Sequence, residues 1–369
     1  MTRLLSTAAL MALLTACGDG QPFVFDEDAV APPGDDAGDP PEDAFDDEEP
    51  PADGEGFEGD LDVPPGTASP SPDASIRRFE PLNETGGGFV RSVSYNAAEE
   101  SFTVDNLAFD GITPYRRDSG LPSMGGYAVF ESDETVRDPV NGDEIGQLDY
   151  RAIYGVSRNS TTVDGERMPV SRFAIVRSGD FVDYGFGGFL YERNGGVELP
   201  ERRDGQAVFI GDYAGTRVFS GRGGQELTEG RMQIAVDFTD FNESEGVDGM
   251  LYDRHAYDVE TGRPIKATQD GTRVETADGV VLDLPTARFT LATGSTTADG
   301  EILGNISSSV MVDGTLEDYE SGSYYGIIGG DLDTGGEVVG VLVMTSDDPR
   351  YDGVTAQETG GFILYREAP

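Results

Sequence analysis

The stretch from Gly205 to Asp253 decides the fold: it begins GQAVFIGDYAGTRVF, continues GRMQIAVDFTDF and ends VDGMLYD. In its middle segment, apolar residues alternate with residues that are mostly polar. The apolar set comprises Met232, Ile234, Val236 and Phe238. The intervening set comprises Arg231, Gln233, Ala235 and Asp237. Because side chains of a strand point alternately to its two faces, this period predicts an antiparallel strand with one buried face.

Segments of the same kind recur to the end of the chain, with turns rich in glycine or acidic residues between them. We expect eight strands, near residues 205–219, 230–238, 246–253, 286–293, 300–309, 321–330, 335–345 and 359–366. Eight strands suffice to close a small antiparallel β-barrel and to remove every sheet edge. No segment keeps a helical period, so the sequence predicts an all-β protein.

The first residues predict export and a lipid anchor. Arg3 precedes a short apolar run from Leu4 to Leu14, which is the pattern of a signal peptide and is too short to span a bilayer. The next residues, Leu-Thr-Ala-Cys, end at Cys17 and resemble the lipobox of bacterial lipoproteins. That resemblance implies cleavage after residue 16 and attachment of lipid, including acyl chains such as palmitate, to Cys17. The alternative is an ordinary secretory signal with a chance cysteine.

The residue after Cys17 bears on the destination of the anchor. In the lipoprotein family an aspartate at that position favours retention in the inner membrane, and here the position is Gly18. We therefore expect an outer-membrane protein, lipid-anchored there or at the cell surface. Several acyl chains on one residue would anchor the chain stably, whereas one chain would bind only marginally.

An acidic segment follows the lipobox. Residues 18–75 contain no Lys, Arg or His, and Asp, Glu, Pro and Gly dominate them. Such a composition cannot bury enough apolar surface to offset the entropy of ordering, so residues 17–75 are predicted to be a disordered tether. The tether is a spacer that holds a folded part off the membrane, or a lure for cations or a basic partner. The formal net charge of −45 argues against a nucleic-acid partner, whose phosphates need a basic surface.

The chain therefore divides into four predicted parts. They are the signal peptide (residues 1–16), the tether (17–75), a β-rich segment (76–200) and the barrel (201–369). In the β-rich segment, short strands separated by Gly, Asn, Asp and Pro are expected near residues 102–104, 126–130, 150–154, 172–176 and 185–193.

Several barrel segments resemble a known family. They are Gly205–Tyr213, Ile234–Phe238, Val247–Leu251, Gly322–Gly326, Gly335–Val341 and Gly360–Phe362. Their order is similar to that in the eight-stranded barrel of the transferrin-binding protein B family, which are Gram-negative surface lipoproteins. The resemblance implies a β-rich "handle" before the barrel, for which residues 76–200 are the candidate. The transferrin binders carry two handle–barrel lobes and this chain has room for one, so the ligand is left open.

Groups for catalysis or metal binding are scarce. His255 is the one histidine, and the sequence holds no Ser-x-x-Lys, G-x-S-x-G or phosphate-loop motif, so we expect no enzyme and no cofactor. The densest oxygen-bearing group in the barrel segment is a weak candidate for a calcium loop, in a predicted turn between two strands. Its members are Asp240, Asn242, Glu243 and Asp248. The alternative for these residues is a solvated turn.

Two functions stay open on these observations. The first is a lipid-anchored surface protein that binds an unknown soluble protein or small solute with a non-catalytic barrel. The second is a structural or assembly lipoprotein of the cell envelope. A membrane-spanning barrel is a third reading, but glycine and charge occur on both predicted strand faces and Cys17 already provides an anchor.

Replacing Cys17 by serine tests the anchor. The Cys17→Ser variant lacks the sulfur that would carry lipid, so it should stay uncleaved or become soluble, while the wild type should enter the detergent phase on phase separation. A processed Cys17→Ser protein that still enters the detergent phase would contradict the lipoprotein prediction.

Overall fold

The computed structural model describes the chain from Val63 to Glu367 with several gaps. The described residues are 63–105, 107, 114–133, 135–138, 140–199, 205–238, 246–265, 282–290, 296–333 and 335–367. Every regular element in these residues is a β strand, which confirms the predicted all-β fold. A search of the same residues finds no helix long and apolar enough to cross a membrane.

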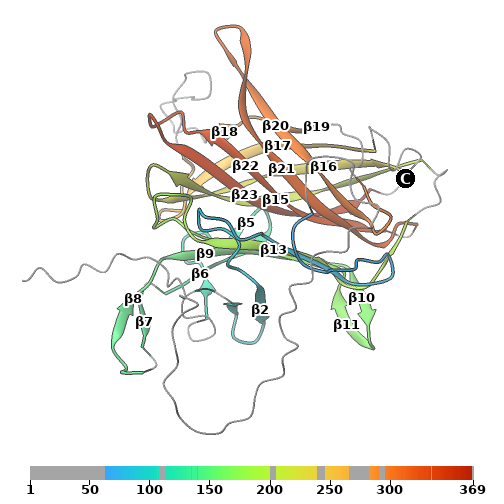
Figure 1. Cartoon of the computed structure of the whole chain (residues 1–369), viewed down its shortest axis with the longest axis horizontal. Helices are drawn as coiled ribbons and strands as arrows, with labels where there is room; N and C mark the ends of the chain where they lie inside the picture. The colour runs from blue at the N-terminus through green and yellow to red at the C-terminus, as the bar shows by residue number, and fades with distance from the viewer. Residues whose placement is uncertain are drawn as a thin grey trace, which may run out of the picture. The chain divides into compact units, whose positions relative to one another are not determined.

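The residues before the barrel form a seven-stranded sheet, in the order β1–β13–β12–β9–β6–β4 with β5 paired to β6. The strands are β1 (Ile76–Phe79), β4 (Arg116–Arg117), β5 (Ser123–Met124), β6 (Tyr127–Glu131), β9 (Tyr150–Val156), β12 (Ser171–Ser178) and β13 (Gly187–Arg193). Three hairpins accompany it: β2 (Ser92–Asn96) with β3 (Ser101–Asp105), β7 (Thr135–Arg137) with β8 (Glu144–Gly146), and β10 (Ser160–Val163) with β11 (Glu166–Pro169). We call this part the handle; Figure 1 colours it blue to green.

The second part is a closed antiparallel barrel of eight wall strands. Its strands are β15 (Gln206–Ser220), β16 (Gln225–Asp237), β17 (Val247–Asp258), β19 (Ala287–Thr290), β20 (Glu301–Val312), β21 (Thr315–Asp331), β22 (Glu337–Asp347) and β23 (Thr355–Arg366). Each pairs with the next, and β23 pairs back to β15, which closes the ring. Short β18 (Leu282–Leu284) pairs with β17, and β14 (Val197–Glu198) adds in parallel to β21. Each of the eight predicted segments falls on one wall strand.

The register of β16 follows the alternation in the sequence. Met232, Ile234 and Val236 are 0% exposed and Phe238 is 2% exposed. All four belong to the apolar core inside the barrel, whereas Arg231 and its alternating neighbours are exposed or half-buried. The predicted register is confirmed, because a slip of one residue would exchange the two faces.

The handle covers one side of the barrel wall. Outward-facing apolar residues of β21, β22 and β23 pack against apolar residues of β9, β12 and β13. The barrel contributes Ile327, Val339, Val341 and Ile363, and the handle contributes Ile153, Phe173, Ile175 and Phe189. Burial of side chains of this size contributes about 1.5–3 kcal/mol each. These outward residues contact protein, whereas a membrane-spanning barrel would turn them toward lipid.

Two adjacent glycines on β23 allow close packing on both faces of the wall. A Cβ atom on Gly360 would lie 1.9 Å from the hydroxyl oxygen of Tyr213, inside the barrel. A Cβ atom on Gly361 would lie 2.3 Å from the ring of Phe173, in the handle. Both distances are far below van der Waals contact, so these positions require glycine.

The composition places residues 63–75 in the tether, but in the structure they contact the handle. Arg193, which is fully buried, donates hydrogen bonds from Nη2 to the carbonyl oxygens of Ser71 at 3.0 Å and Ala74 at 2.8 Å. Ordered contacts therefore begin before residue 76, the predicted start of the folded part. The remainder of the predicted tether lies outside the described residues.

Two N-terminal truncations test the role of residues 63–75. A chain that begins at Ile76 lacks the carbonyl groups of Ser71 and Ala74, so a buried donor of Arg193 is left unpaired. Desolvation lowers the pKa of Arg193 to about 10, partly offset by nearby Glu301 and Asp299, so the side chain stays charged at neutral pH. We expect the chain from Ile76 to be less stable than the chain from Val63 by about 1–3 kcal/mol. Equal midpoints in urea unfolding would contradict this expectation.

Candidate binding surface

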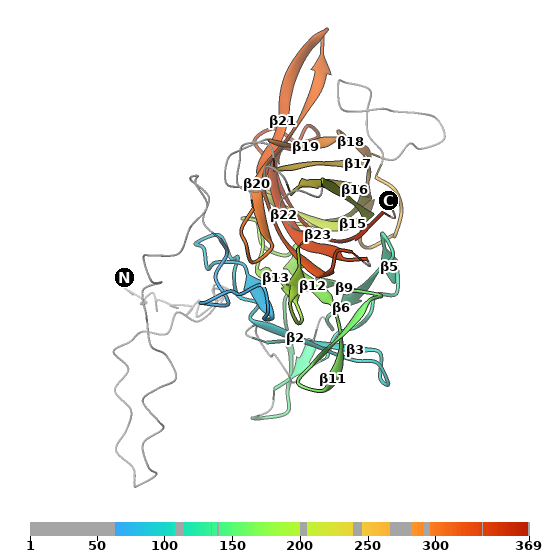
Figure 2. The same cartoon turned by 90° about the vertical axis from the view of Figure 1, so that its right-hand side faces the viewer.

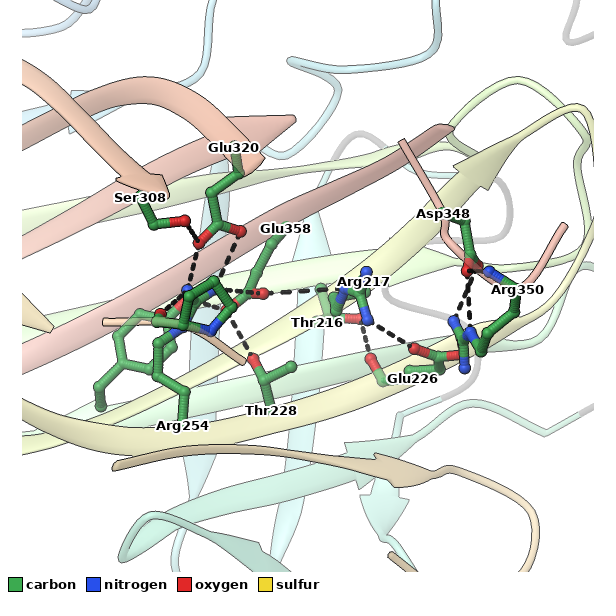
Figure 3. Close-up of polar contacts among 12 residues, drawn as sticks. Thr216, Arg217, Glu226, Thr228, Arg254, Ser308, Glu320, Asp348, Arg350 and Glu358 are labelled. Atoms are coloured by element: carbon green, nitrogen blue, oxygen red, sulfur yellow. Dashed lines mark hydrogen bonds and ion pairs between the residues drawn. The ribbon is translucent and has the colours of Figure 1, made fainter. Parts of the chain in front are cut away.

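Side chains fill the lumen of the barrel in two layers. Near the start of β15, the lumen holds an apolar cluster to which all eight wall strands contribute; Phe209, Tyr324 and Phe362 are fully buried members. Near the turns that join β15 to β16 and β22 to β23, the lumen holds arginines and carboxylates (Figure 3). An eight-stranded barrel has room for packed side chains or one small ligand. Side chains of the described residues occupy this lumen in the two layers.

Four arginines and four carboxylates make up the polar layer, which we call the ionic cluster. Its members are Arg217, Arg222, Arg254, Arg350, Glu226, Glu320, Asp348 and Glu358. Glu358 lies at the centre: its Oε2 accepts a hydrogen bond from Arg254 Nη2 at 2.9 Å and lies 3.8 Å from Arg217 Nε. Its Oε1 accepts from the hydroxyls of Tyr213 at 2.8 Å and Thr228 at 2.9 Å.

The formal charges of the ionic cluster cancel, so it adds no net charge to the lumen. Arg254 is almost fully buried and pairs with both Glu320 and Glu358. Burial by itself lowers the pKa of Arg254, but the charges of the two glutamates outweigh it and raise the pKa above its ordinary value. Because Arg254 stays charged, loss of one partner would leave a buried ion without compensation.

The outer part of the ionic cluster fixes two turns of the barrel. Arg350, in the β22–β23 turn, lies 2.8 Å from Glu226 and 2.8 Å from Asp348. Arg222, in the β15–β16 turn, lies 3.1 Å from Glu226 and stacks over the ring of Phe219 at 3.4 Å. Burial alone would raise the pKa of Asp348, but hydrogen bonds from Arg350 and its charge lower that pKa. These contacts link the β15–β16 turn to the β22–β23 turn.

A long hairpin projects from the same end of the barrel. Figures 1 and 2 show the β20–β21 hairpin extending past the neighbouring strands. Asp313 and Gly314 form its turn with φ of 51° and 82°, as a type I′ turn requires. Met311 and Leu316 face each other across the hairpin and are 57% and 66% exposed. The tip therefore presents apolar side chains to solvent.

Two other turns at this end also expose apolar side chains. Tyr351 is exposed in the β22–β23 turn, and Phe181 and Val182 are exposed in the β12–β13 turn of the handle. The handle turn is attached to the barrel, because Gly221 donates its N–H to the carbonyl oxygen of Val182 at 2.9 Å. We call these exposed residues the rim surface: Phe181, Val182, Met311, Leu316 and Tyr351.

Three grooves, of about 610, 530 and 470 Å³, run between the handle and the barrel wall. Glu337 of β22 lines one of them and is buried. It accepts hydrogen bonds from Ser157 at 2.6 Å, Asn159 at 2.7 Å and Ser171 at 2.5 Å, all in the handle. Burial raises the pKa of Glu337, and these donors and the charge of Arg158 offset it only in part.

Most of the residues singled out in the sequence lie outside the described residues. These are Cys17, Asp240, Asn242 and Glu243. Asp248, the fourth member of the calcium-loop candidate, is described as an exposed residue of β17 opposite Ala235. Within the described residues no group of three His, Cys, Asp or Glu is placed to hold a metal ion. His255 lies on β17, with Nε2 3.3 Å from Asp253 Oδ1.

Sequence reasoning missed the ionic cluster. Arg217, Glu320 and Glu358 occupy the inward phase of strands whose other inward residues are mostly apolar, and that is the signal that could have found them. Charges of both signs in the buried phase of several strands indicate ions paired inside the barrel. The alternation along β17 does not place Arg254 on the inward face. The pairing of β16 with β17 shifts between Glu229 and Arg231, and this shift changes which β17 residues lie opposite β16.

Among the comparisons with known proteins, only the comparison with solved structures finds similar proteins. No protein-family model matches the sequence, and no curated protein matches it. The chain is similar to two mutant structures of transferrin binding protein B, a vaccine antigen from Haemophilus parasuis Hp5. The first is 9% identical over 76% of this chain and 46% of that chain, with a TM-score of 0.30. The second is 10% identical over 75% and 66%, with a TM-score of 0.28.

This chain thus spans about half to two thirds of the length of those structures. The handle and the barrel described above rest on the strand pairing of this chain itself.

Removing the central carboxylate tests the ionic cluster. Glu358→Ala leaves Arg254 with one partner fewer in the lumen and should lower the free energy of unfolding by about 3–5 kcal/mol. The matched variant Glu367→Ala, at an exposed glutamate just after β23, should change it by about 0.5 kcal/mol or less. Urea denaturation measures both, and similar values for the two variants would contradict the assignment.

The raised pKa of Glu337 predicts a pH dependence. A carboxyl whose pKa is raised by folding stabilises the fold fully below its unfolded pKa, and that contribution is lost as pH rises through the folded pKa. Glu337→Gln removes this loss, so its unfolding free energy relative to wild type should increase between about pH 4 and pH 8. Glu166→Gln, at an exposed site on β11, should show no trend. A difference for Glu337→Gln that stays constant with pH would refute the role of its charge.

Proposed function

We propose that this protein is a lipid-anchored binding protein of the outer membrane or cell surface that captures a soluble protein at its rim surface. The filled lumen carries the proposal. An apolar layer and the ionic cluster occupy the interior, so recognition has to use the outside of the barrel. The rim surface offers exposed apolar groups on turns of a rigid scaffold, where binding residues are commonly found.

The projecting hairpin has the chemistry of a contact site between proteins. Met311 and Leu316 together offer an apolar tip that costs free energy to keep in water. A two-stranded hairpin that extends beyond its sheet is only marginally stable, and a partner seated on it would stabilise it. Apolar side chains at the centre of an interface supply most of its binding energy when water is excluded around them.

Charge around the tip points to a partner with a basic surface. Asp313, Glu317 and Asp318 are exposed on the hairpin beside the apolar pair, and Asp352 is exposed next to Tyr351. The chain as a whole has a formal net charge of −45. Such a field accelerates encounters with a positively charged protein and repels negatively charged ones, an effect that salt weakens.

The sequence features before the folded part fit this role. Lipid on Cys17 would hold the chain at the membrane, and the acidic tether would keep the rim surface away from the lipid headgroups.

Retention of soluble proteins by the immobilised full-length chain tests the proposal. The double variant Met311→Ser, Leu316→Ser removes the apolar tip and should abolish retention of a protein that the wild type holds, without changing the melting temperature. Val140→Ser, at a side chain 92% exposed in the handle, is the matched control and should retain that protein.

Two results would overturn the proposal. One is the same set of soluble proteins on the wild type and on the double variant. The other is retention of envelope proteins alone, which would favour the structural or assembly role. Retention by the rim surface should also weaken as salt increases, because charge contributes to the encounter.

A further inference from the structure

One groove between the handle and the barrel gathers positive charge. It lies between β6 and β9 of the handle and β15, β16 and β23 of the barrel, and its volume is about 470 Å³. We call it the arginine groove, after three arginines among its lining residues: Arg117, Arg158 and Arg231. The chain holds 70 acidic residues against 25 Lys and Arg, so a groove with three arginines departs from its general composition.

Two of these arginines form no ion pair within the described part of the chain, although the charge of Arg158 acts on Glu337 of the neighbouring groove. Arg117 and Arg158 each contact an aromatic ring. Arg78 and Arg177, also at the junction of handle and barrel, each pair with a glutamate, at 2.7 Å and 2.8 Å. Arg117 and Arg158 therefore differ from Arg78 and Arg177, because neither forms an ion pair within the described residues.

The guanidinium of Arg158 is held in place by a tyrosine. Its carbon lies 3.6 Å from the ring centroid of Tyr365, and the backbone N–H of Arg158 donates to the hydroxyl of Tyr365 at 3.0 Å. A guanidinium stacked by one face keeps its N–H edge free for a planar acceptor. Arg158 is thus oriented before any ligand arrives, which lowers the entropy lost on binding.

The carboxylates near the groove are already engaged. Asp212 pairs with Arg231 at 3.2 Å, and both side chains are about half exposed. Glu229 accepts hydrogen bonds from the hydroxyl of Tyr257 at 2.5 Å and from a backbone N–H at 3.2 Å. Glu337 lines the neighbouring groove together with Arg158 and accepts three hydrogen bonds from the handle. Three arginines and Asp212 therefore leave an excess of positive charge in the arginine groove.

Apolar surface lies beside this charge. Tyr154 and Val156 of β9 line the same groove, and Val156 is 44% exposed. The volume is in the range of pockets that take small molecules, which combine apolar walls with a few oriented polar groups. A carboxylate matches the fork of a guanidinium with two parallel hydrogen bonds.

We propose that the arginine groove binds a small organic carboxylate. Its anionic end pairs with Arg158 and Arg117, and its apolar body lies against Tyr154 and Val156. The site is separate from the rim surface, and it does not depend on capture of a soluble protein there.

Calorimetric titration of the full-length chain with benzoate, at constant ionic strength, tests this site. Benzoate should bind the wild type, and Arg158→Gln should weaken binding about tenfold or more, since it removes a charge-assisted pair. Arg288→Gln, at an exposed arginine of β19 on another part of the wall, should leave binding unchanged. Melting temperatures of both variants confirm that each is folded.

Three results would overturn the proposal. They are no binding of benzoate, equal binding by wild type and Arg158→Gln, and equal binding of the uncharged analogue benzyl alcohol. Inorganic phosphate, titrated in parallel, should bind more weakly than benzoate because it lacks the apolar body. Phosphate binding without benzoate binding is a case of the first result and would show a general anion site.

Discussion

The ion pair between Arg254 and Glu358 couples strands that are not neighbours in the barrel wall. Arg254 lies on β17 and Glu358 on β23, with β15 and β16 between them in the ring. Closing the barrel removes both charges from water, so each has to find its partner inside. The same requirement extends to Arg217, Glu226 and the turn residues beyond. The ionic cluster therefore exists only in the closed barrel, and the geometry of the rim turns depends on it.

A wall that is buried on both faces sets the second constraint. On β23, Gly360 gives room to Tyr213 inside the barrel and Gly361 gives room to Phe173 of the handle outside. Because the ring of Tyr213 lies close to Gly360, its hydroxyl can donate a hydrogen bond to Glu358 of the ionic cluster. Where the handle no longer packs tightly on the wall, grooves remain, and the arginine groove is one of them.

The side chains that stabilise the barrel and the side chains that it exposes lie in different places. Within the part of the chain that the structure describes, the apolar layer and the ionic cluster occupy the lumen. The exposed apolar and charged side chains lie instead on the turns of the barrel and along its border with the handle. The rim surface is apolar with acidic neighbours, whereas the arginine groove is basic with aromatic walls. Two surfaces of opposite charge on one scaffold suit two different classes of ligand.

The sequence by itself predicted the eight wall strands of the barrel and, where the alternation is regular, the face that a side chain occupies. The alternation through Met232, Ile234 and Val236 fixed the register of β16, because a strand has a strict period of two. It did not show which residues meet. Arg254 and Glu358 are 104 positions apart, and Arg158 meets Tyr365 across 207 positions. The period of a strand assigns each side chain to a face but does not identify the residue that it contacts. The contacts of the ionic cluster, the arginine groove and the rim surface therefore arise only when the barrel closes and the handle packs on it.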